Sequence, residues 1–382
     1  MEINLKKPTK KQIIEYAVIG LLLIATVIMF LGLSNNKFSF RVNNTNNVSY
    51  VKATVQEVIS QDLSNKTENP YQTGKQVLSV KINEGDFKGE IIQLTHYITP
   101  TFQLFLKQGS NVILRADLSQ GTDPFFSVYS YNRTFPIAII VLFFLALVII
   151  IGRKKGFLSC VGLLFTMATI ICFMLPRLYE GGNTFAIIFI TVLLSASATC
   201  FCINGFSKKT VLNLSSILCG SLSAVLLYYL FMLLLNFNGS AMAEAENLLL
   251  ISYSTNLNLT GVLFAGVAVS ALGAVMDVAV SLGASLSEIK DLNPGITSKE
   301  LFKSGMNIGR DMIGTMTNTL ILAFAGGAVA TMLILISYGV QFHQLLSSNF
   351  IALELATGIA GSAAVVLTVP ISSAINSFCF KK

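Results

Sequence analysis

Residues 135–155 read FPIAIIVLFFLALVIIIGRKK, an uninterrupted apolar run that ends in three basic residues. Similar runs recur along the chain, and each is long enough to cross a hydrocarbon core about 30 Å thick. The 382 residues are 53% hydrophobic and 12% charged, with a mean hydropathy of +0.69. Soluble domains carry about a quarter charged residues. The composition therefore excludes a soluble enzyme, a disordered chain and a nucleic-acid binder, and indicates a multi-pass membrane protein.

Eight apolar runs are expected to form transmembrane helices. They cover residues 13–33, 135–151, 157–175, 184–203, 211–235, 259–283, 311–338 and 350–378. Every second short loop is basic, as at 153–155 and 208–209, and basic loops face the cytoplasm. We therefore expect a multi-pass protein of the cell membrane with both termini in the cytoplasm. Residues 1–33 would comprise a cytoplasmic N-terminal segment and an uncleaved transmembrane anchor. Residues 135–382 would form a seven-helix membrane domain.

Residues 34–134 have the composition of a water-soluble domain and are expected outside the cytoplasm. Apolar and polar residues alternate at 51–56, 78–82 and 112–117, and Gly- and Asn-rich turns separate these segments. Alternation with a period of two predicts strands with one buried face. We predict a small all-β domain, an OB-like or SH3-like barrel. Two interpretations stay open: a structural domain that packs on its own membrane region, and a module that binds a ligand at its loops.

Asp277 is the residue most in need of explanation, because an Asp at bilayer depth costs about 2.5–3.5 kcal/mol on insertion scales. It lies in the stretch GAVMDVAVS, residues 273–281. At helical spacing it shares one small, polar face with Gly266, Ser270, Gly273, Ser281 and Ser285. Such a face allows another backbone to approach closely or leaves room for an ion beside the carboxylate.

The next run opens with a second polar face, formed by Asp311, Thr315 and Asn318. Arg310, Gly314 and Thr317 lie beside it. Consecutive helices joined by a cytoplasmic loop are expected to be antiparallel neighbours, so the two faces would meet in the inner leaflet of the membrane. Glycines expected to support helix packing are Gly266, Gly273, Gly309 and Gly314.

Two hypotheses follow for these faces. In the first they form an ion or substrate site, with Asp277 as the ion-binding carboxylate and Arg310 as a counter-charge. The remaining members of that site would be Ser281, Asp311, Thr315, Asn318 and Thr319. In the second, Asp277 pairs with Arg310 in a clamp that only holds two helices together. Asp311 also has an ordinary explanation as an acidic residue near a helix N-terminus.

Two loops carry local signals. Residues 236–258 predict a short helix at the outer surface. Thr297 and Glu300 have capping-box spacing and predict a surface or re-entrant helix in the loop 284–310. Phosphate-loop, zinc-protease and nucleophile-elbow motifs are not found. We therefore expect no enzyme activity, and accordingly no catalytic residue, metal or cofactor.

These segments resemble the YibE/YibF family of bacterial multi-pass membrane proteins. The matching motifs are 273–279 (GAVMDVA), Ser285, Glu288, 300–302 (ELF), 304–306 (SGM), 309–311 (GRD), 314–315 (GT) and 318–320 (NTL). The resemblance covers roughly residues 150–380. The anchor and outer domain resemble the longer, YibE-type members, and the resemblance implies a transport role. A shorter YibF-type protein, or a second copy of the chain, would be its partner within the bilayer.

Two functions are therefore carried forward. The first is a secondary transporter or exporter of an ion or small molecule, with an intramembrane Asp site. The second is a non-transporting membrane scaffold or receptor whose β domain binds an envelope ligand or partner.

Overall fold

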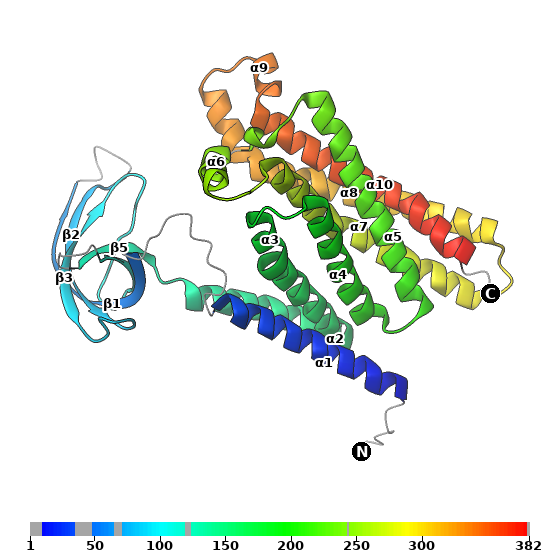
Figure 1. Cartoon of the computed structure of the whole chain (residues 1–382), viewed down its shortest axis with the longest axis horizontal. Coiled ribbons are helices and arrows are strands. Elements are labelled where there is room, and N and C mark those ends of the chain that lie inside the picture. The colour runs from blue at the N-terminus through cyan, green and yellow to red at the C-terminus, as the bar shows by residue number, and fades with distance from the viewer. Residues whose placement is uncertain (1–9, 35–47, 65–70, 119–123, 243, 380–382) are drawn as a thin grey trace. The chain divides into compact units, whose positions relative to one another are not determined.

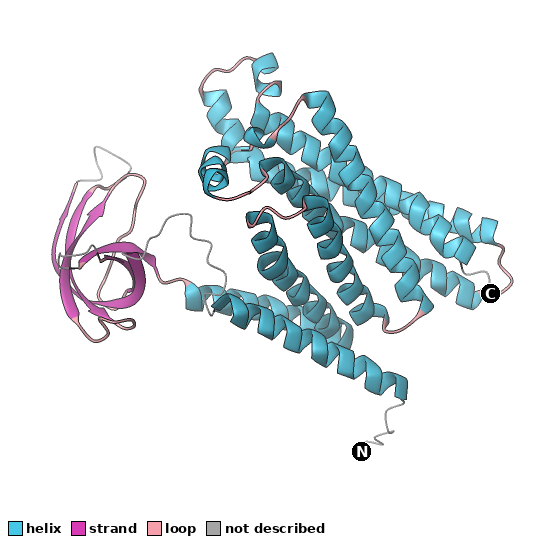
Figure 2. Cartoon of the chain, in the orientation of Figure 1, coloured by secondary structure: helices cyan, strands magenta, loops and turns pink. Residues whose placement is uncertain are grey.

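The computed structural model describes residues 10–34, 48–64, 71–118, 124–242 and 244–379 (Figure 1). Contacts divide the chain into two compact units, residues 41–147 and residues 1–40 with 148–382. The described strands all belong to the first unit, and the rest of the described chain is mostly helical (Figure 2). This confirms the predicted fold class, a helical membrane protein with a small all-β domain.

The β domain is one antiparallel sheet of five strands. The strands are β1 (Val48–Leu63), β2 (Gly74–Ile82), β3 (Ile91–Ile98), β4 (Asn111–Asp117) and β5 (Phe125–Tyr131). Their order in the sheet is β3-β2-β1-β4-β5, so β1 is central and pairs with both β2 and β4. The sheet keeps two edges, β3 and β5, and is therefore a half-barrel, an open form of the small barrel that the sequence patterning predicted.

The strands form where the apolar alternation predicted them. The inward residues of β1, β2 and β4 are all 5% exposed or less: Val51, Ala53, Val55, Leu78, Val80, Ile82, Val112, Leu114 and Ala116. The register of β1 with β2 shifts twice, between Val55 and Glu57 and between Val58 and Ser60. Such bulges bend a strand, and they give the long β1 the curvature that wraps the half-barrel around this core.

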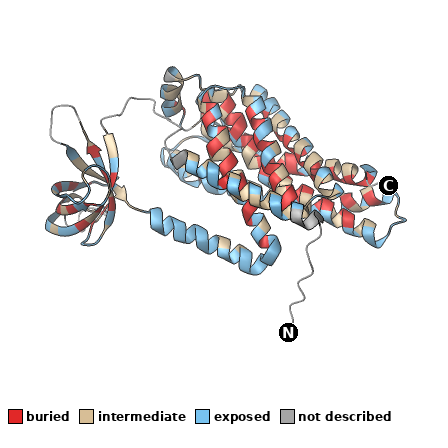
Figure 3. Ribbon diagram, turned by 60° about the horizontal axis from the view of Figure 1, so that its bottom comes forward, coloured by how far each residue is buried: buried red, intermediate tan, exposed pale blue. Residues whose placement is uncertain are grey.

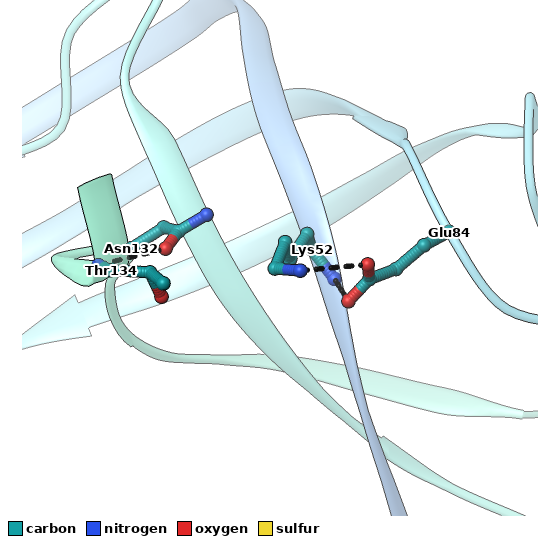
Figure 4. A network of polar contacts seen from close by, with 4 residues as sticks. All are labelled: Lys52, Glu84, Asn132 and Thr134. Atoms are coloured by element: carbon teal, nitrogen blue, oxygen red, sulfur yellow. Dashed lines mark hydrogen bonds and ion pairs between the residues drawn. The ribbon is translucent and has the colours of Figure 1, made fainter. Parts of the chain in front are cut away.

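Polar contacts fix the end of the sheet at which β2 ends at Ile82 and β5 ends at Tyr131 (Figure 4). Lys52 Nζ lies 3.0 Å from Glu84 Oε2, which ties β1 to the turn after β2. At the end of β5, Asn132 Oδ1 accepts a hydrogen bond of 3.2 Å from the backbone N–H of Thr134. That contact satisfies one of the free donors of the following helix.

Two buried polar side chains hold the segment between β3 and β4 against the sheet. Gln76 donates to the carbonyl of Leu106 and accepts from its N–H, both at 3.0 Å. His96, 4% exposed, lies opposite Gln76 on β3, and its Nε2 is 2.8 Å from the carbonyl oxygen of Leu104. Burial lowers the pKa of His96 below its ordinary value of 6.5, while the bond to Leu104 opposes this effect.

Acid is expected to loosen this segment. The unfolded chain takes up a proton on His96 near pH 6.5, whereas the folded domain does so only at lower pH. The unfolded state therefore binds more protons in this window, and the free energy of unfolding falls as pH drops below about 6.5. Hydrogen exchange of residues 104–106 in the full-length protein, corrected for intrinsic rates, should quicken from pH 7 to pH 5. A His96→Gln variant should lack this acceleration, and an equal acceleration in both proteins would contradict the assignment.

The helical elements follow in chain order. They are α1 (Lys10–Ser34), α2 (Thr134–Thr169), a π-helical turn (Ile170–Met174), α3 (Leu175–Tyr179), α4 (Thr184–Asn204), α5 (Lys208–Leu235), a 3₁₀ turn (Gly239–Ala241), α6 (Ala245–Ser254), α7 (Leu259–Leu292), α8 (Ser298–Ser337), α9 (Phe342–Leu346) and α10 (Asn349–Cys379). Seven helical segments of the described chain are long and apolar enough to cross a membrane. The short helix predicted within 236–258 is α6.

The eight predicted runs are all helical, but two of them belong to one segment, Thr134–Tyr179. Arg153 interrupts that segment with a backbone φ of 50° and ψ of −131°, outside the helical region. Gly156 is required just after it, because a Cβ there would overlap the carbonyl oxygen of Val148. The runs 135–151 and 157–175 are therefore two helical arms separated by a sharp break among basic residues.

In the membrane unit, α10 packs against α5, α7 and α8. In the most apolar stretch of each of α4, α7 and α10, half of the residues are buried. Figure 3 shows buried residues gathered along the bundle. In the corresponding apolar stretch of α8, only 6% of the residues are buried.

The capping box at Thr297 and Glu300 is confirmed, with Glu300 N donating to Thr297 Oγ1 at 3.3 Å and Thr297 N to Glu300 Oε2 at 2.9 Å. The separate surface or re-entrant helix predicted there is wrong. The capped turn is the beginning of α8, which runs without a break to Ser337. Helix-weakening glycines within it are tolerated because Gly305 and Gly309 pack closely against Ser373 and Val369 of α10.

Candidate functional site

Asp277 lies near the middle of α7, 15 residues before the helix ends at Leu292. At 1.5 Å per residue this is about 23 Å from the end. The buried face of α7 includes Val275, Val278, Ala279 and Leu282, and Asp277 lies on the opposite, exposed face. A carboxyl group at this depth is thus on the outside of the chain's own bundle.

The whole polar face of α7 is oriented outward in the same way. Gly266, Gly273, Asp277 and Ser281 are exposed, and Ser270 and Ser285 are half-buried. A Cβ added at Gly266 or Gly273 would meet nothing within 4 Å. These two glycines therefore leave an open, shallow stripe on α7 and do not serve packing within this chain.

The polar face of α8 is exposed as well. Its exposed members are Arg310, Asp311, Gly314, Thr315, Asn318 and Thr319. The hydroxyls of Thr315 and Thr319 bond back to carbonyls of their own helix, at 3.1 and 2.9 Å. Of the four glycines expected to support packing, only Gly309 meets a neighbouring helix, since Gly314, like Gly266 and Gly273, is open.

The prediction that α7 and α8 are neighbours is confirmed, but their contact is apolar. Val278, Leu282 and Leu286 of α7 belong to one cluster with Leu301 and Met312 of α8. Asp277 and Arg310, both fully described, form no hydrogen bond or ion pair with each other, and Arg310 instead donates to Asn307 at 3.3 Å. The clamp hypothesis therefore lacks the contact that it needs, and each polar face is exposed on its own helix.

A second polar feature, which sequence reasoning missed, lies inside the bundle. Asn213 of α5 and Ser287 of α7 are 1% exposed, and Ser373 and Asn376 of α10 are fully buried. Each carries at least one buried side-chain atom with no hydrogen-bond partner in the described structure. Gly283 makes room for the side chain of Asn213, because a Cβ at position 283 would overlap the amide oxygen Oδ1 of Asn213.

Orphaned buried polar atoms are the usual positions of internal water. This polar layer lies on the core side of α7, opposite Asp277. The signal available in the sequence was the helical spacing of polar residues within apolar runs, as in Ser372, Ser373, Asn376 and Ser377. A single Asn or Ser in such a run carries little weight until a neighbouring helix brings several together.

Long apolar helices around a shared core, preceded by a β half-barrel, define a multi-pass membrane protein. A family model described as YibE/F-like protein matches residues 140–382, and the chain belongs to that family. The matched range holds all of α3 to α10, including both polar stripes and the polar layer, and begins after the half-barrel. Neither the curated proteins nor the solved structures that were compared gave a match.

Proposed function

We propose that the protein is a subunit of a proton-coupled secondary transporter, in which Asp277 binds and releases the coupling proton. The observation that carries this proposal is the carboxyl group of Asp277, which has no ion-pair partner among the described residues and lies in the middle of a membrane helix on a face of small residues. Ionisable residues at such depth are costly, and they mark ion pathways when no structural partner compensates. A metal cation needs several oxygen ligands, whereas a proton needs a single carboxylate oxygen.

The proposed orientation follows the distribution of basic residues. The break at Arg153 and the loop between α4 and α5, with Lys208 and Lys209, would face the cytoplasm. The half-barrel would then lie outside the cell membrane. Asp277 would alternate between protonated and charged forms as access changes from one side to the other.

An exposed carboxyl cannot face acyl chains without a large cost, so the stripe on α7 needs a cover. We assign that cover to a second copy of the chain, because the stripe Gly266, Ser270, Gly273, Asp277 and Ser281 has the small-residue spacing that lets two helices approach closely. A self-complementary stripe suits a two-fold axis. A shorter YibF-type protein is the other candidate for the cover, and cross-linking distinguishes it from a second copy of the chain.

Cross-linking is expected to detect this interface. Gly273→Cys should give a disulfide-linked dimer in oxidised membranes, in a background where the exposed Cys219 and Cys379 are replaced by serine. Leu226→Cys is the matched control, since Leu226 of α5 is 59% exposed but does not belong to the stripe on α7. A cross-link to a smaller protein would identify a YibF-type partner, and equal cross-linking at both positions would contradict the interface.

The transport proposal is tested with purified full-length protein in sealed vesicles. An imposed membrane potential, negative inside, should drive proton uptake that a trapped pH-sensitive dye records. The uptake should exceed that of vesicles without protein. If uptake equals that of protein-free vesicles under both potential and pH gradients, the chain does not move protons by itself, and the proposal fails for an assembly of identical copies.

A second candidate function, a receptor for an envelope ligand, is favoured by one feature of the half-barrel. Tyr50 and Tyr129 are each 54% exposed and pack edge to face with ring centroids 4.9 Å apart. Arg115 lies opposite Tyr50 on the neighbouring strand. Exposed aromatics beside an arginine are typical of binding surfaces. Deleting residues 40–130 separates the two functions, because a receptor would lose its ligand while a transporter would keep proton binding in its membrane unit.

A further inference from the structure

A cavity of about 280 Å³ lies where α1, α2 and α4 come together, well apart from Asp277. Its polar lining consists of Glu15 and Tyr16 from α1, Lys154 and Lys155 from α2, and Asn204 from the end of α4. The apolar run of α1 begins at Ile14, α4 ends at Asn204, and the two lysines follow the break at Arg153. Helix ends that converge in this way mark a membrane–water boundary.

The described charged groups of this cavity do not neutralise one another by forming ion pairs. In the described part of the chain, Glu15 forms no ion pair with Lys154 or Lys155. Lys154 Nζ lies 3.3 Å from the Tyr16 hydroxyl and 5.2 Å from the centre of its ring, contacts that leave its charge uncompensated. The amide nitrogen of Asn204 is buried and has no acceptor. The cavity thus offers two cations and a free N–H donor beside one carboxylate.

Glu15 lies close to Gly205, the residue that follows the end of α4. The backbone of Gly205 has φ of 61°, and a Cβ there would lie only 2.7 Å from Glu15 Oε1. The Glu15 carboxylate is therefore half-buried against the residue that follows α4. It belongs to α1, whereas the two lysines belong to α2.

We propose that this cavity binds the headgroup of a zwitterionic phospholipid with a primary ammonium, phosphatidylethanolamine. Its phosphate would accept hydrogen bonds from Lys154, Lys155 and the Asn204 amide. Its ammonium would donate to the Glu15 carboxylate. Charge-assisted hydrogen bonds of both kinds are the strong ones, and the two charges of the headgroup match the two signs of the cavity.

The acidic member decides against a purely anionic lipid. Basic clusters at a membrane surface attract phosphatidylglycerol and similar lipids by charge alone. The half-buried carboxylate in the same cavity repels an anionic headgroup. If the phosphate of such a lipid bound both lysines, the carboxylate would have no cation as a partner. An ammonium placed beside the phosphate removes both difficulties.

The bound lipid would fasten α1 to the bundle. Among the described side chains of α1, only Thr26 is buried, so the helix has little apolar packing of its own on the rest of the unit. A headgroup held between Glu15 and the two lysines would bridge α1 to α2 and α4.

The test is lipid binding by the purified full-length protein, measured by native mass spectrometry with phosphatidylethanolamine and phosphatidylglycerol of identical acyl chains. The unsubstituted protein should retain phosphatidylethanolamine preferentially. Glu15→Gln should weaken that binding about tenfold, as expected for one hydrogen bond to a charged group, and should leave phosphatidylglycerol binding unchanged or stronger, because the repelling charge is gone. Lys154→Gln should weaken both lipids. Lys209→Gln, at an exposed lysine paired with Asp291 at 3.3 Å, is the control and should change neither.

Retained phosphatidylglycerol binding in Glu15→Gln also shows that the variant is folded. A preference of the unsubstituted protein for phosphatidylglycerol would overturn the proposal in favour of a simple anionic-lipid site. Unchanged phosphatidylethanolamine binding in Glu15→Gln would overturn it as well, because the ammonium would then have no specific partner.

Discussion

Replacing Asp277 by asparagine is expected to reduce potential-driven proton uptake to the level of protein-free vesicles. Asparagine keeps the size and the hydrogen-bonding capacity of the side chain but cannot take up and release a proton. Asp277 is exposed on α7, and a Cβ at the neighbouring Gly273 would meet nothing within 4 Å. The substitution therefore disturbs no packing within the chain, and we expect the variant to fold.

The control for this variant is Glu354→Gln. Glu354 lies on α10 and lines an otherwise apolar cavity between α8 and α10. It is also an acidic residue in a membrane helix, but it lies away from the polar stripes of α7 and α8. Glu354→Gln should keep most of the uptake. Equal uptake by Asp277→Asn and the unsubstituted protein would remove Asp277 from the transport mechanism.

A chemical probe checks the same claim without a transport substrate. Hydrophobic carbodiimides react with protonated carboxyl groups that are accessible from the membrane. A fluorescent carbodiimide should label the unsubstituted protein and Glu354→Gln, and labelling should fall in Asp277→Asn. Labelling should also decrease with rising pH, since only the protonated carboxyl reacts. Undiminished labelling of Asp277→Asn would place the reactive carboxyl elsewhere.

Much of the fold could be predicted because its determinants are local. The buried positions of β1, β2 and β4 are those of the apolar alternation, from Val51 to Ala116. Helix capping at Thr297 depends on residues three apart and was equally visible. Whether the small barrel closes was not visible in the sequence, because closure depends on whether β3 and β5 pair, and neither strand carries a signal for its partner.

The site was predictable only in part for a related reason. Helical periodicity tells which residues share a face with Asp277, but it does not tell whether that face is turned toward the bundle or away from it. The direction is set by the larger apolar face of α7, which packs on α5 and α10 and turns the small polar face outward. The buried layer at Asn213 and Asn376 depends wholly on which helices meet, and so appears only in three dimensions.

Gly309→Leu is expected to destabilise the membrane unit strongly. Gly309 is buried where α8 crosses α10, and a Cβ there would overlap Val369 Cγ1 and lie 3.0 Å from Val369 Cγ2. Val369 is itself fully buried. Overpacking of a close-packed interior costs typically about 1–3 kcal/mol and more when a neighbour cannot shift. Thermal unfolding in detergent, followed by loss of the monodisperse peak on size exclusion, should show a markedly lower midpoint.

Gly314→Leu, five residues further along the same helix, is the matched control. Nothing lies within 4 Å of the position, and leucine is a better helix former than glycine by roughly 0.5–1 kcal/mol. Its midpoint should be unchanged or higher. Should both substitutions lower the midpoint equally, the effect would come from leucine on α8 in general and not from the contact with Val369.

A rescue distinguishes steric overlap from any other role of Gly309. Gly309→Ala alone should destabilise the protein, because the overlap with Val369 begins at Cβ. Val369→Ala alone leaves a small cavity and should destabilise it too. The double variant should be more stable than the sum of the two changes predicts, since the alanine methyl at 309 fills the space left by Val369. Strict additivity would show that α8 and α10 are not locked together at this point, and the outward orientation of the α8 polar face would then lose its anchor.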